Sequence, residues 1–337
     1  MSTPPLPVRA AIVGAGLMGR WHAHAIRHAG ASVAVVIDPL PERAKRLASR
    51  VRGGTAAASE LAAALREHRP DVVHVCSPVE THEPVAMASL DAGAHVLIEK
   101  PLAVDAPATR RLHERAAEQG VLLCPVHQFL FQRGVLESIR RLPELGPLRQ
   151  LDIVACSAGA DGQSDAVREQ VARDILPHGL ALARRILGRA VAEASWSVAG
   201  SAGELRALAS LGATTIVLSV SMRARPTENS LIIRCDGGTV RANLYHGFAT
   251  IERGAPSRID KALRPFAESS LILGAAAANV AWRALSAEPA YPGLRALVRT
   301  FYRAVAQGAP SPIGVDESID VAHMRDVISA ERDRSPH

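Results

Sequence analysis

The strongest constraint on the fold is a glycine-rich segment near the amino terminus, Gly14-Ala15-Gly16-Leu17-Met18-Gly19. It directly follows a short apolar run, Ala10–Val13, and precedes a helix-like segment, which is the setting that a GxGxxG motif needs to bind a dinucleotide. The first glycine permits a tight turn, the second lets the backbone approach a pyrophosphate, and the third lets the helix pack on the strand. Free N–H groups at the helix start face the phosphates. We therefore predict cofactor contacts from Gly14, Gly16, Leu17, Met18 and Gly19.

A carboxylate, Asp38, ends the second candidate strand, at the spacing of about 20 residues where dinucleotide-binding proteins hold the adenosine ribose. An aspartate there accepts hydrogen bonds from the ribose hydroxyls of NAD and repels the 2′-phosphate of NADP. Arg43 lies one helical turn into the next segment and partly reduces this preference for NAD over NADP. The alternative is a glycine-rich turn beside an ordinary surface aspartate. We predict NAD as the cofactor, with NADP less favoured.

Residues 8–127 alternate short aliphatic runs with helix-like segments. The candidate strands are 10–13, 33–37, 72–76, 95–98 and 121–126, and the candidate helices are 19–29, 41–50, 82–92 and 106–118. This alternation is typical of a parallel sheet wrapped by helices. Because the strands are continuously apolar, both faces of the sheet should be buried. We predict an α/β domain over 1–127, with the doubly wound parallel sheet of a Rossmann fold.

The pattern changes after residue 128. Candidate strands lie at 148–156, 192–199, 213–222, 230–235 and 239–244, and candidate helices at 167–187, 261–285, 293–307 and 316–330. Asp236-Gly237-Gly238 supplies turn chemistry for a hairpin, so we predict a largely antiparallel sheet. The domain over 128–337 is expected to be α+β. Its helix over 261–285 is apolar on most sides and should be buried against the sheet or a second subunit.

Composition argues against several classes of partner. The net charge is +6, but the arginines are scattered and aromatic residues make up only 3% of the chain, so no nucleic-acid surface is expected. The four cysteines lie far apart without a CxxC pair, which favours neither disulfides nor a metal site and suits the cytoplasm. Residues 1–7 do not resemble a signal peptide. The most lipid-like stretch, 270–282, is too short to span a membrane.

A lysine follows the fourth candidate strand, in Glu99-Lys100-Pro101, at the edge of the sheet where doubly wound folds bind ligands. The chain has three lysines among 39 basic residues, so arginine is its usual positive charge. Lysine differs from arginine in being a compact donor whose pKa can fall far enough for proton transfer. We interpret Lys100 as a functional residue, and the alternative is a surface lysine at a strand end.

Asp174 and His178 are separated by four residues within a candidate helix. On a helix these side chains share one face, and histidine titrates near the pH where proton exchange is efficient. The alternative is that Asp174 caps a helix whose first turn contains Pro177.

Together these motifs resemble the Gfo/Idh/MocA family over nearly the whole chain. The resemblance rests on the glycine motif, Asp38, Ser77-Pro78 to Thr81-His82, Glu99-Lys100-Pro101, and the segment from Asp174 to His178, which is similar to the family's DxxxH segment. It implies an NAD-dependent oxidoreductase that acts on a carbinol or carbonyl carbon of a sugar, nucleotide sugar or cyclic polyol. It also implies that the domain over 128–337 binds the substrate and forms the interface of a homodimer or homotetramer. Lys100 would hydrogen-bond the reacting oxygen, His178 would exchange its proton, and Asp174 would orient the site. Ser77, Pro78, Glu99 and Lys100 would contact the cofactor.

Two further residues are weaker cofactor candidates. His82 either lines the nicotinamide pocket or is a polar residue at a helix start, and Gln128 follows a strand where the family often has a histidine–asparagine pair. The chain departs from the family at 168–173, in place of a glycine cluster, and at Ala181, in place of an aspartate. Two other functions remain open: a redox-assisted glycosidase or lyase, and a non-catalytic NAD-binding regulator.

Overall fold

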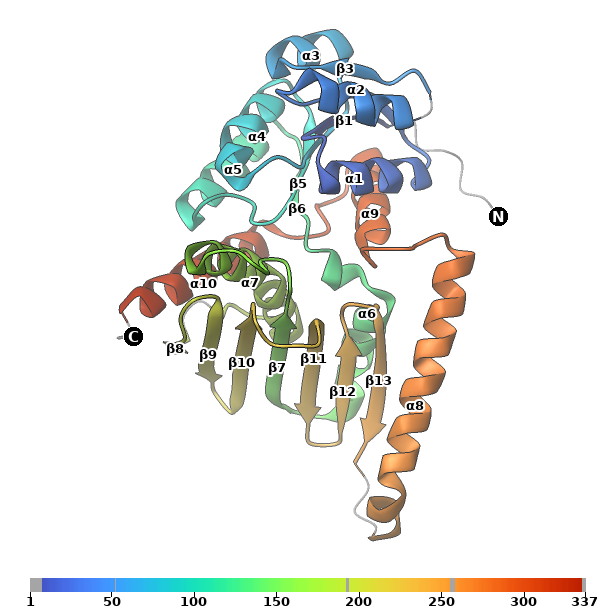
Figure 1. Ribbon diagram of the computed structural model, residues 1–337, viewed down its shortest axis with the longest axis vertical. Coiled ribbons are helices and arrows are strands. Elements are labelled where there is room, and N and C mark those ends of the chain that lie inside the picture. Colours follow the sequence, from blue (N-terminus) through green and yellow to red (C-terminus); the bar gives the residue numbers. More distant parts are fainter. Residues whose placement is uncertain (1–7, 52, 192–193, 255–257, 335–337) are drawn as a thin grey trace. The chain divides into compact units, whose positions relative to one another are not determined.

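The computed structural model describes residues 8–51, 53–191, 194–254 and 258–334, and for residues 258–262 it describes the backbone alone. It divides into two compact units, shown in one view in Figure 1. The first contains the chain up to His127 together with Leu294–Ala322, and the second contains Gln128–Gly293 and the residues from His323 onward.

The first unit contains a six-stranded parallel sheet in the order β3-β2-β1-β4-β5-β6. Its strands are β1 (Arg9–Val13), β2 (Ser32–Ile37), β3 (Ala56–Ala58), β4 (Val72–Val75), β5 (His95–Ile98) and β6 (Leu123–Pro125). The connecting helices are α1 (Leu17–His28), α2 (Pro41–Arg50), α3 (Leu61–His68), α4 (His82–Asp91) and α5 (Ala106–Glu118). Every residue of β4 is buried, as expected of a strand covered on both faces. The predicted doubly wound α/β fold is confirmed.

A late segment of the chain returns to this first unit. The helix α9 (Leu294–Gln307) packs against α1 and buries Phe301 and Tyr302 completely. The sequence prediction assigned all of 128–337 to one continuous second domain, whereas Leu294–Ala322 belongs to the first unit. The physical reason is that the apolar face of α9 is buried here rather than against the second sheet.

The second unit is built on a seven-stranded sheet in the order β13-β12-β11-β7-β10-β9-β8. Its strands are β7 (Leu148–Cys156), β8 (Trp196–Ala199), β9 (Glu204–Leu211), β10 (Thr214–Ser221), β11 (Glu228–Cys235), β12 (Gly238–Asn243) and β13 (Phe248–Arg253). Only β7 and β10 pair in parallel, so the predicted largely antiparallel sheet is confirmed. The predicted hairpin turn is also present, since Cys235 pairs with Gly238.

Helices lie against this second sheet. The helix α7 (Asp165–Leu187) contacts β7, β9 and β10, and α6 (Arg133–Arg141) contacts β12 and β13. The long helix α8 (Arg258–Leu285) runs beside the edge strand β13 (Figure 1), and α10 (Val315–Arg334) ends the described chain. None of the helices in the described ranges is long and apolar enough to cross a membrane.

Some elements were missed or misjudged from the sequence. The short alanine-rich strand β3 and the helix α3 are not among the predicted elements. The strands β9 and β13 are not among them either, although β9 alternates buried and exposed residues. The strand predicted over 192–199 is observed only as Trp196–Ala199, and 192–193 lie outside the described residues. The second sheet covers α8 only in part, because Phe266, Leu273 and Leu285 are 74%, 72% and 90% exposed in the single chain. Burial of this helix against a second subunit stays a prediction.

Candidate active site

The carboxyl ends of the parallel strands bring the predicted cofactor residues of the first unit to one edge. Gly14 follows β1, Asp38 follows β2, Ser77 lies just beyond β4, and Glu99 and Lys100 follow β5. The strand order reverses between β1 and β4, and open α/β sheets bind ligands at this switch point. Backbone hydrogen bonds hold the edge in register, from Gly14 N–H to the Ile37 carbonyl at 2.8 Å and from Glu99 N–H to the Val75 carbonyl at 2.9 Å.

The three glycines of the turn have different surroundings. Gly14 has φ +97°, and a Cβ there would lie 2.6 Å from the Cys76 carbonyl oxygen. A Cβ on Gly19 would overlap the Gly14 carbonyl oxygen, so the close approach of α1 to the turn requires glycine. A Cβ on Gly16 would meet nothing within 4 Å. Gly16 therefore borders open space, where a ligand can approach the backbone.

The start of α1 fits a dinucleotide pyrophosphate. Gly16 is the N-cap residue without any side-chain cap, and the first turn carries no acidic residue. The first N–H groups of a helix have no partner within it, and they attract anions. Leu17 begins the helix and is exposed, and Met18 is half-buried beside it.

Asp38 is held against this turn. Its carboxylate is only 5% exposed, and it accepts hydrogen bonds from Ala15 N–H at 2.8 Å and from Leu40 N–H at 3.0 Å. Asp38 thus ties the end of β2 to the glycine turn. A carboxylate has about four acceptor sites, so two remain for ribose hydroxyls.

Glu99 ends a buried chain of hydrogen bonds that the sequence analysis missed. Its Oε1 lies 3.0 Å from His22 Nε2, His22 Nδ1 lies 2.7 Å from His74 Nδ1, and His74 Nε2 lies 2.7 Å from the Tyr302 hydroxyl. His22, His74 and Tyr302 are completely buried. The available signal was His74 itself, a polar residue inside an otherwise aliphatic strand.

One assignment of protons satisfies every bond in this chain. Tyr302 donates to His74, His74 donates to His22, and His22 donates to Glu99. Burial, and next the nearby His22, lowers the pKa of His74 well below its usual value, which keeps that ring neutral. Burial likewise raises the pKa of Tyr302, so the phenol stays protonated. The chain fixes Glu99, whose Oε2 accepts the Lys100 N–H at 3.2 Å.

His82 joins two loops at this edge. It is the first residue of α4 and is 1% exposed, with Nδ1 2.8 Å from the Pro101 carbonyl oxygen and Nε2 2.9 Å from the Ser77 carbonyl oxygen. Ser77 in turn accepts a hydrogen bond from the Thr81 hydroxyl at 2.7 Å, and Pro78 precedes the 3-10 turn Val79–Thr81. His82 thus links the loop after β4 to the Lys100-Pro101 segment.

The DxxxH residues lie in the second unit. Asp174 and His178 are both half-buried within α7, and His178 stacks on Phe129 with ring centroids 4.6 Å apart. The helix-cap alternative for Asp174 is wrong, because the Ser164 hydroxyl caps α7 and accepts from Val167 N–H at 3.3 Å. Asp174 and Pro177 lie in the helix interior. Gln128 opens the 3-10 turn Gln128–Phe131 and is 7% exposed.

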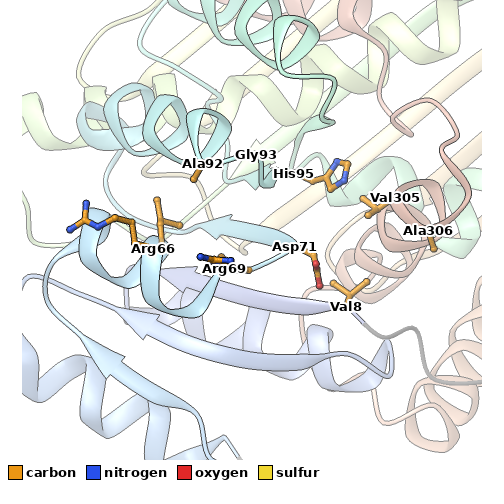
Figure 2. A pocket seen from close by; sticks show the side chains of 11 residues that line it. Val8, Arg66, Arg69, Asp71, Ala92, Gly93, His95, Val305 and Ala306 are labelled. Atoms are coloured by element: carbon orange, nitrogen blue, oxygen red, sulfur yellow. The ribbon is translucent and has the colours of Figure 1, made fainter.

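The opposite edge of the first sheet carries a separate cavity of about 620 Å³. Figure 2 shows Val8, Asp71 and His95, which lie at the amino ends of strands, among its lining residues. Burial lowers the pKa of His95, whose Nδ1 accepts a hydrogen bond from Leu122 N–H at 2.9 Å. This cavity is therefore not part of the dinucleotide edge. In the described part of the chain, no three His, Cys, Asp or Glu side chains are grouped to hold a metal ion.

Comparison with solved structures identifies the fold. The chain aligns with UDP-N-acetylglucosamine 3-dehydrogenase GnnA from Acidithiobacillus ferrooxidans with a TM-score of 0.76 and 20% identity, covering 97% of this chain and 98% of that one. The 3-ketoreductase KijD10 from Actinomadura kijaniata, solved with NADP, aligns with a TM-score of 0.73 and 21% identity, covering 97% and 98%. At these identities the likeness concerns the fold alone.

Sequence comparison finds relatives for the first part of the chain. Inositol 2-dehydrogenase 2 from Mycolicibacterium vanbaalenii is 33% identical over 193 residues, which cover 55% of each chain. The chain thus spans about half the length of the curated relatives that it matches. Residues 8–127 match the model of the oxidoreductase family with an NAD-binding Rossmann fold. Over these residues the chain is similar to the dinucleotide-binding unit of Gfo/Idh/MocA oxidoreductases.

Proposed function

We propose that this protein is an NAD(H)-dependent oxidoreductase that transfers hydride to or from a carbinol or carbonyl carbon of a sugar, nucleotide sugar or cyclic polyol. The observation that carries the proposal is the carboxyl edge of the first sheet. There the open Gly16 backbone follows β1, the Asp38 carboxylate follows β2, and the Glu99–Lys100 segment follows β5. Gly14, Gly16, Leu17, Met18 and Gly19 would hold the pyrophosphate, and Asp38 the ribose. Ser77, Pro78 and Glu99 would border the cofactor, and His82 would hold their loops.

The chemistry divides between a few side chains. When bound, NAD⁺ supplies the hydride acceptor, and NADH the donor. Lys100 would hold the substrate oxygen, and the carbon–oxygen double bond forms as the hydride leaves the carbon. The hydroxyl proton would pass to His178, and Asp174 would orient that part of the site. Histidine suits this exchange because it titrates near neutral pH. Gln128 would contact the cofactor.

The substrate class rests on the relatives. Their names give inositol and UDP-N-acetylglucosamine as substrates, and both are polyhydroxylated rings. The net charge of +6 suits an acidic substrate such as a nucleotide sugar.

The test is a panel of cyclic polyols, sugars and nucleotide sugars mixed with the purified protein and NAD⁺. At least one class should raise the absorbance of reduced nicotinamide. Lys100→Ala and His178→Ala should each lower this turnover by about 10²-fold while leaving NADH binding nearly unchanged. Lys45→Ala, an exposed lysine on α2, should leave both unchanged.

Other outcomes would contradict the proposal in different ways. Substrate cleavage without net change in NADH would indicate the redox-assisted glycosidase or lyase. NADH binding without turnover of any substrate would indicate a regulator. Absence of NADH binding would remove the cofactor assignment itself.

We also propose that the protein is a cytoplasmic homo-oligomer. Its four cysteines are free thiols, as in a reducing compartment, and α8 exposes apolar side chains. The dinucleotide-binding domain would be centred on 1–127, with substrate binding and assembly served by the later residues.

A further inference from the structure

The buried chain from Glu99 to Tyr302 can be formed with two arrangements of its protons. His22 Nδ1 and His74 Nδ1 lie 2.7 Å apart, so one of these nitrogens donates and the other accepts. In a neutral histidine only one ring nitrogen carries a proton, so the direction of this bond fixes the role of the other nitrogen in both rings. The side chains of the chain therefore change together, and its two ends decide which arrangement forms.

The Glu99 end is compatible with both arrangements. If His22 donates from Nε2, Glu99 is a carboxylate, and if His22 accepts at Nε2, the proton of that bond belongs to Glu99. Glu99 Oε2 accepts the Lys100 N–H at 3.2 Å in either case. The two arrangements thus differ in the charge of Glu99, and this end alone does not decide between them.

The Tyr302 end decides between them. The side chain is 0% exposed, and its hydroxyl lies 2.7 Å from His74 Nε2, which is its one hydrogen-bond partner in the described part of the chain. If the hydroxyl accepted from His74, its own proton would be buried without a partner, which is costly. The hydroxyl therefore donates to His74. His74 then donates from Nδ1 to His22, and His22 donates from Nε2 to Glu99.

The helix α9 brings Tyr302 to this place by packing against α1, which carries His22. The rings meet edge to face, with centroids 5.7 Å apart for His74 and Tyr302 and 5.0 Å apart for His22 and His74. All three side chains are completely buried. Phenylalanine has the same ring as tyrosine, so Tyr302→Phe keeps this packing and removes only the hydroxyl that sets the direction of the chain.

We infer that Tyr302 is a positioning residue for the reaction, because its hydroxyl acts through His74 and His22 to keep Glu99 a carboxylate beside Lys100. The inference rests on the proposed function, since it presupposes that Lys100 holds the substrate oxygen. The carboxylate accepts the main-chain N–H of Lys100 and places a negative charge one residue from its ammonium group. The surroundings of Lys100 during turnover then depend on a phenol supplied by α9.

The first measurement is nitrogen-15 NMR of protein labelled at histidine, which distinguishes protonated from unprotonated ring nitrogens. At neutral pH, His74 should carry its proton on Nδ1 and His22 on Nε2. The signals are assigned by their loss in His74→Gln and His22→Gln. In Tyr302→Phe, part of the His74 population should carry the proton on Nε2 instead. Tyr245→Phe, on a tyrosine that is 56% exposed, is the matched control and should leave the spectrum unchanged.

The second measurement is turnover. Tyr302→Phe should lower kcat by about tenfold and change KM and NADH binding less than about twofold, because a buried residue that contacts neither ligand acts on the reaction alone. Glu99→Gln removes the charge directly and should lower kcat at least as much. Adding Tyr302→Phe to Glu99→Gln should lower kcat by less than about twofold further, because both substitutions act on the same charge. Tyr245→Phe should leave kcat unchanged.

Three outcomes would overturn the inference. One is a wild-type spectrum in which His74 carries its proton on Nε2. Another is wild-type kcat in Tyr302→Phe. The third is full additivity of Tyr302→Phe and Glu99→Gln, which would show that Tyr302 acts independently of Glu99. Failure of the proposed function is distinguishable, because no substrate is then turned over. In that case the role in the reaction falls with it, and the spectra still decide whether Tyr302 sets the protons of the two histidines.

Discussion

Lys100 is the proposed site residue whose chemical identity can be tested most directly. It follows β5 at the ligand-binding edge of the sheet and is half-buried, and its own N–H donates to Glu99. Glu99 is in turn fixed by His22. The backbone at Lys100 is therefore positioned by a buried network rather than by an exposed loop.

Lys100→Arg should lower turnover by about 10²-fold or more while leaving NADH binding nearly intact. The substitution keeps the positive charge but replaces a compact, titratable donor with a planar group that stays protonated near neutral pH. Steady-state kinetics with the substrate found in the panel and NADH titration provide the measurement, and Lys45→Arg is the control. Near wild-type turnover in Lys100→Arg would show that Lys100 contributes only its positive charge.

Among the elements, α8 exposes several large apolar side chains. Polar contacts attach it to β13 and neighbouring segments, including Arg264 to Glu252 at 2.6 Å and Asn279 to the His246 carbonyl at 3.0 Å. Phe266, Leu273 and Val280 are 74%, 72% and 67% exposed. They are seven positions apart and so follow one stripe of the helix. An apolar stripe of this kind is typical of an interface between helices.

We expect the purified protein to be an oligomer that buries this stripe. Phe266→Glu combined with Leu273→Glu should shift the mass measured by light scattering toward the monomer without detergent. Leu208→Glu, on an exposed leucine of β9, is the control for a charge placed on the sheet. Dissociation by Leu208→Glu alone would place the interface on the sheet instead, and a monomeric wild type would contradict the assembly altogether.

For the whole molecule, buried histidines make stability depend on pH. Burial lowers the pKa of His113 to about 4, and burial with the nearby His22 lowers the pKa of His74. In the unfolded chain a histidine titrates near 6.5. Between these values the unfolded chain binds a proton that the folded chain does not. The contribution of these two histidines to the free energy of unfolding is therefore complete above pH 6.5 and is lost as the pH falls toward 4.

The contribution of His113 can be isolated by substitution. Each such group changes the free energy of unfolding by about 1.4 kcal/mol per pH unit within its window. His113→Leu should reduce the slope of stability against pH by about 1 kcal/mol per unit between pH 6 and 4.5, measured by chemical denaturation. His28→Leu, on an exposed histidine of α1, should leave the slope nearly unchanged. Equal slopes in wild type and His113→Leu would show that His113 titrates normally in the folded chain.

Local pattern was sufficient to predict the edge residues of the first unit. Gly14, Asp38 and Lys100 each follow a short apolar run, and the ends of parallel strands meet at one edge of a sheet. The helix over Asp174 and His178 was likewise predictable from its length and apolar spacing. Which residues end a strand and which share a helix face depends on neighbours within a few positions. These features can therefore be predicted from a single sequence.

The partners of buried side chains were not predictable in this way. His22, His74, Glu99 and Tyr302 are as far apart as 280 positions along the chain, and no local rule pairs them. The return of α9 to the first unit likewise depends on contacts between segments far apart in the sequence. The sequence determined which segments become strands, turns and helices, because those preferences are local. Tertiary structure alone decided which polar groups are buried together and which stay exposed, because burial depends on contacts between distant segments.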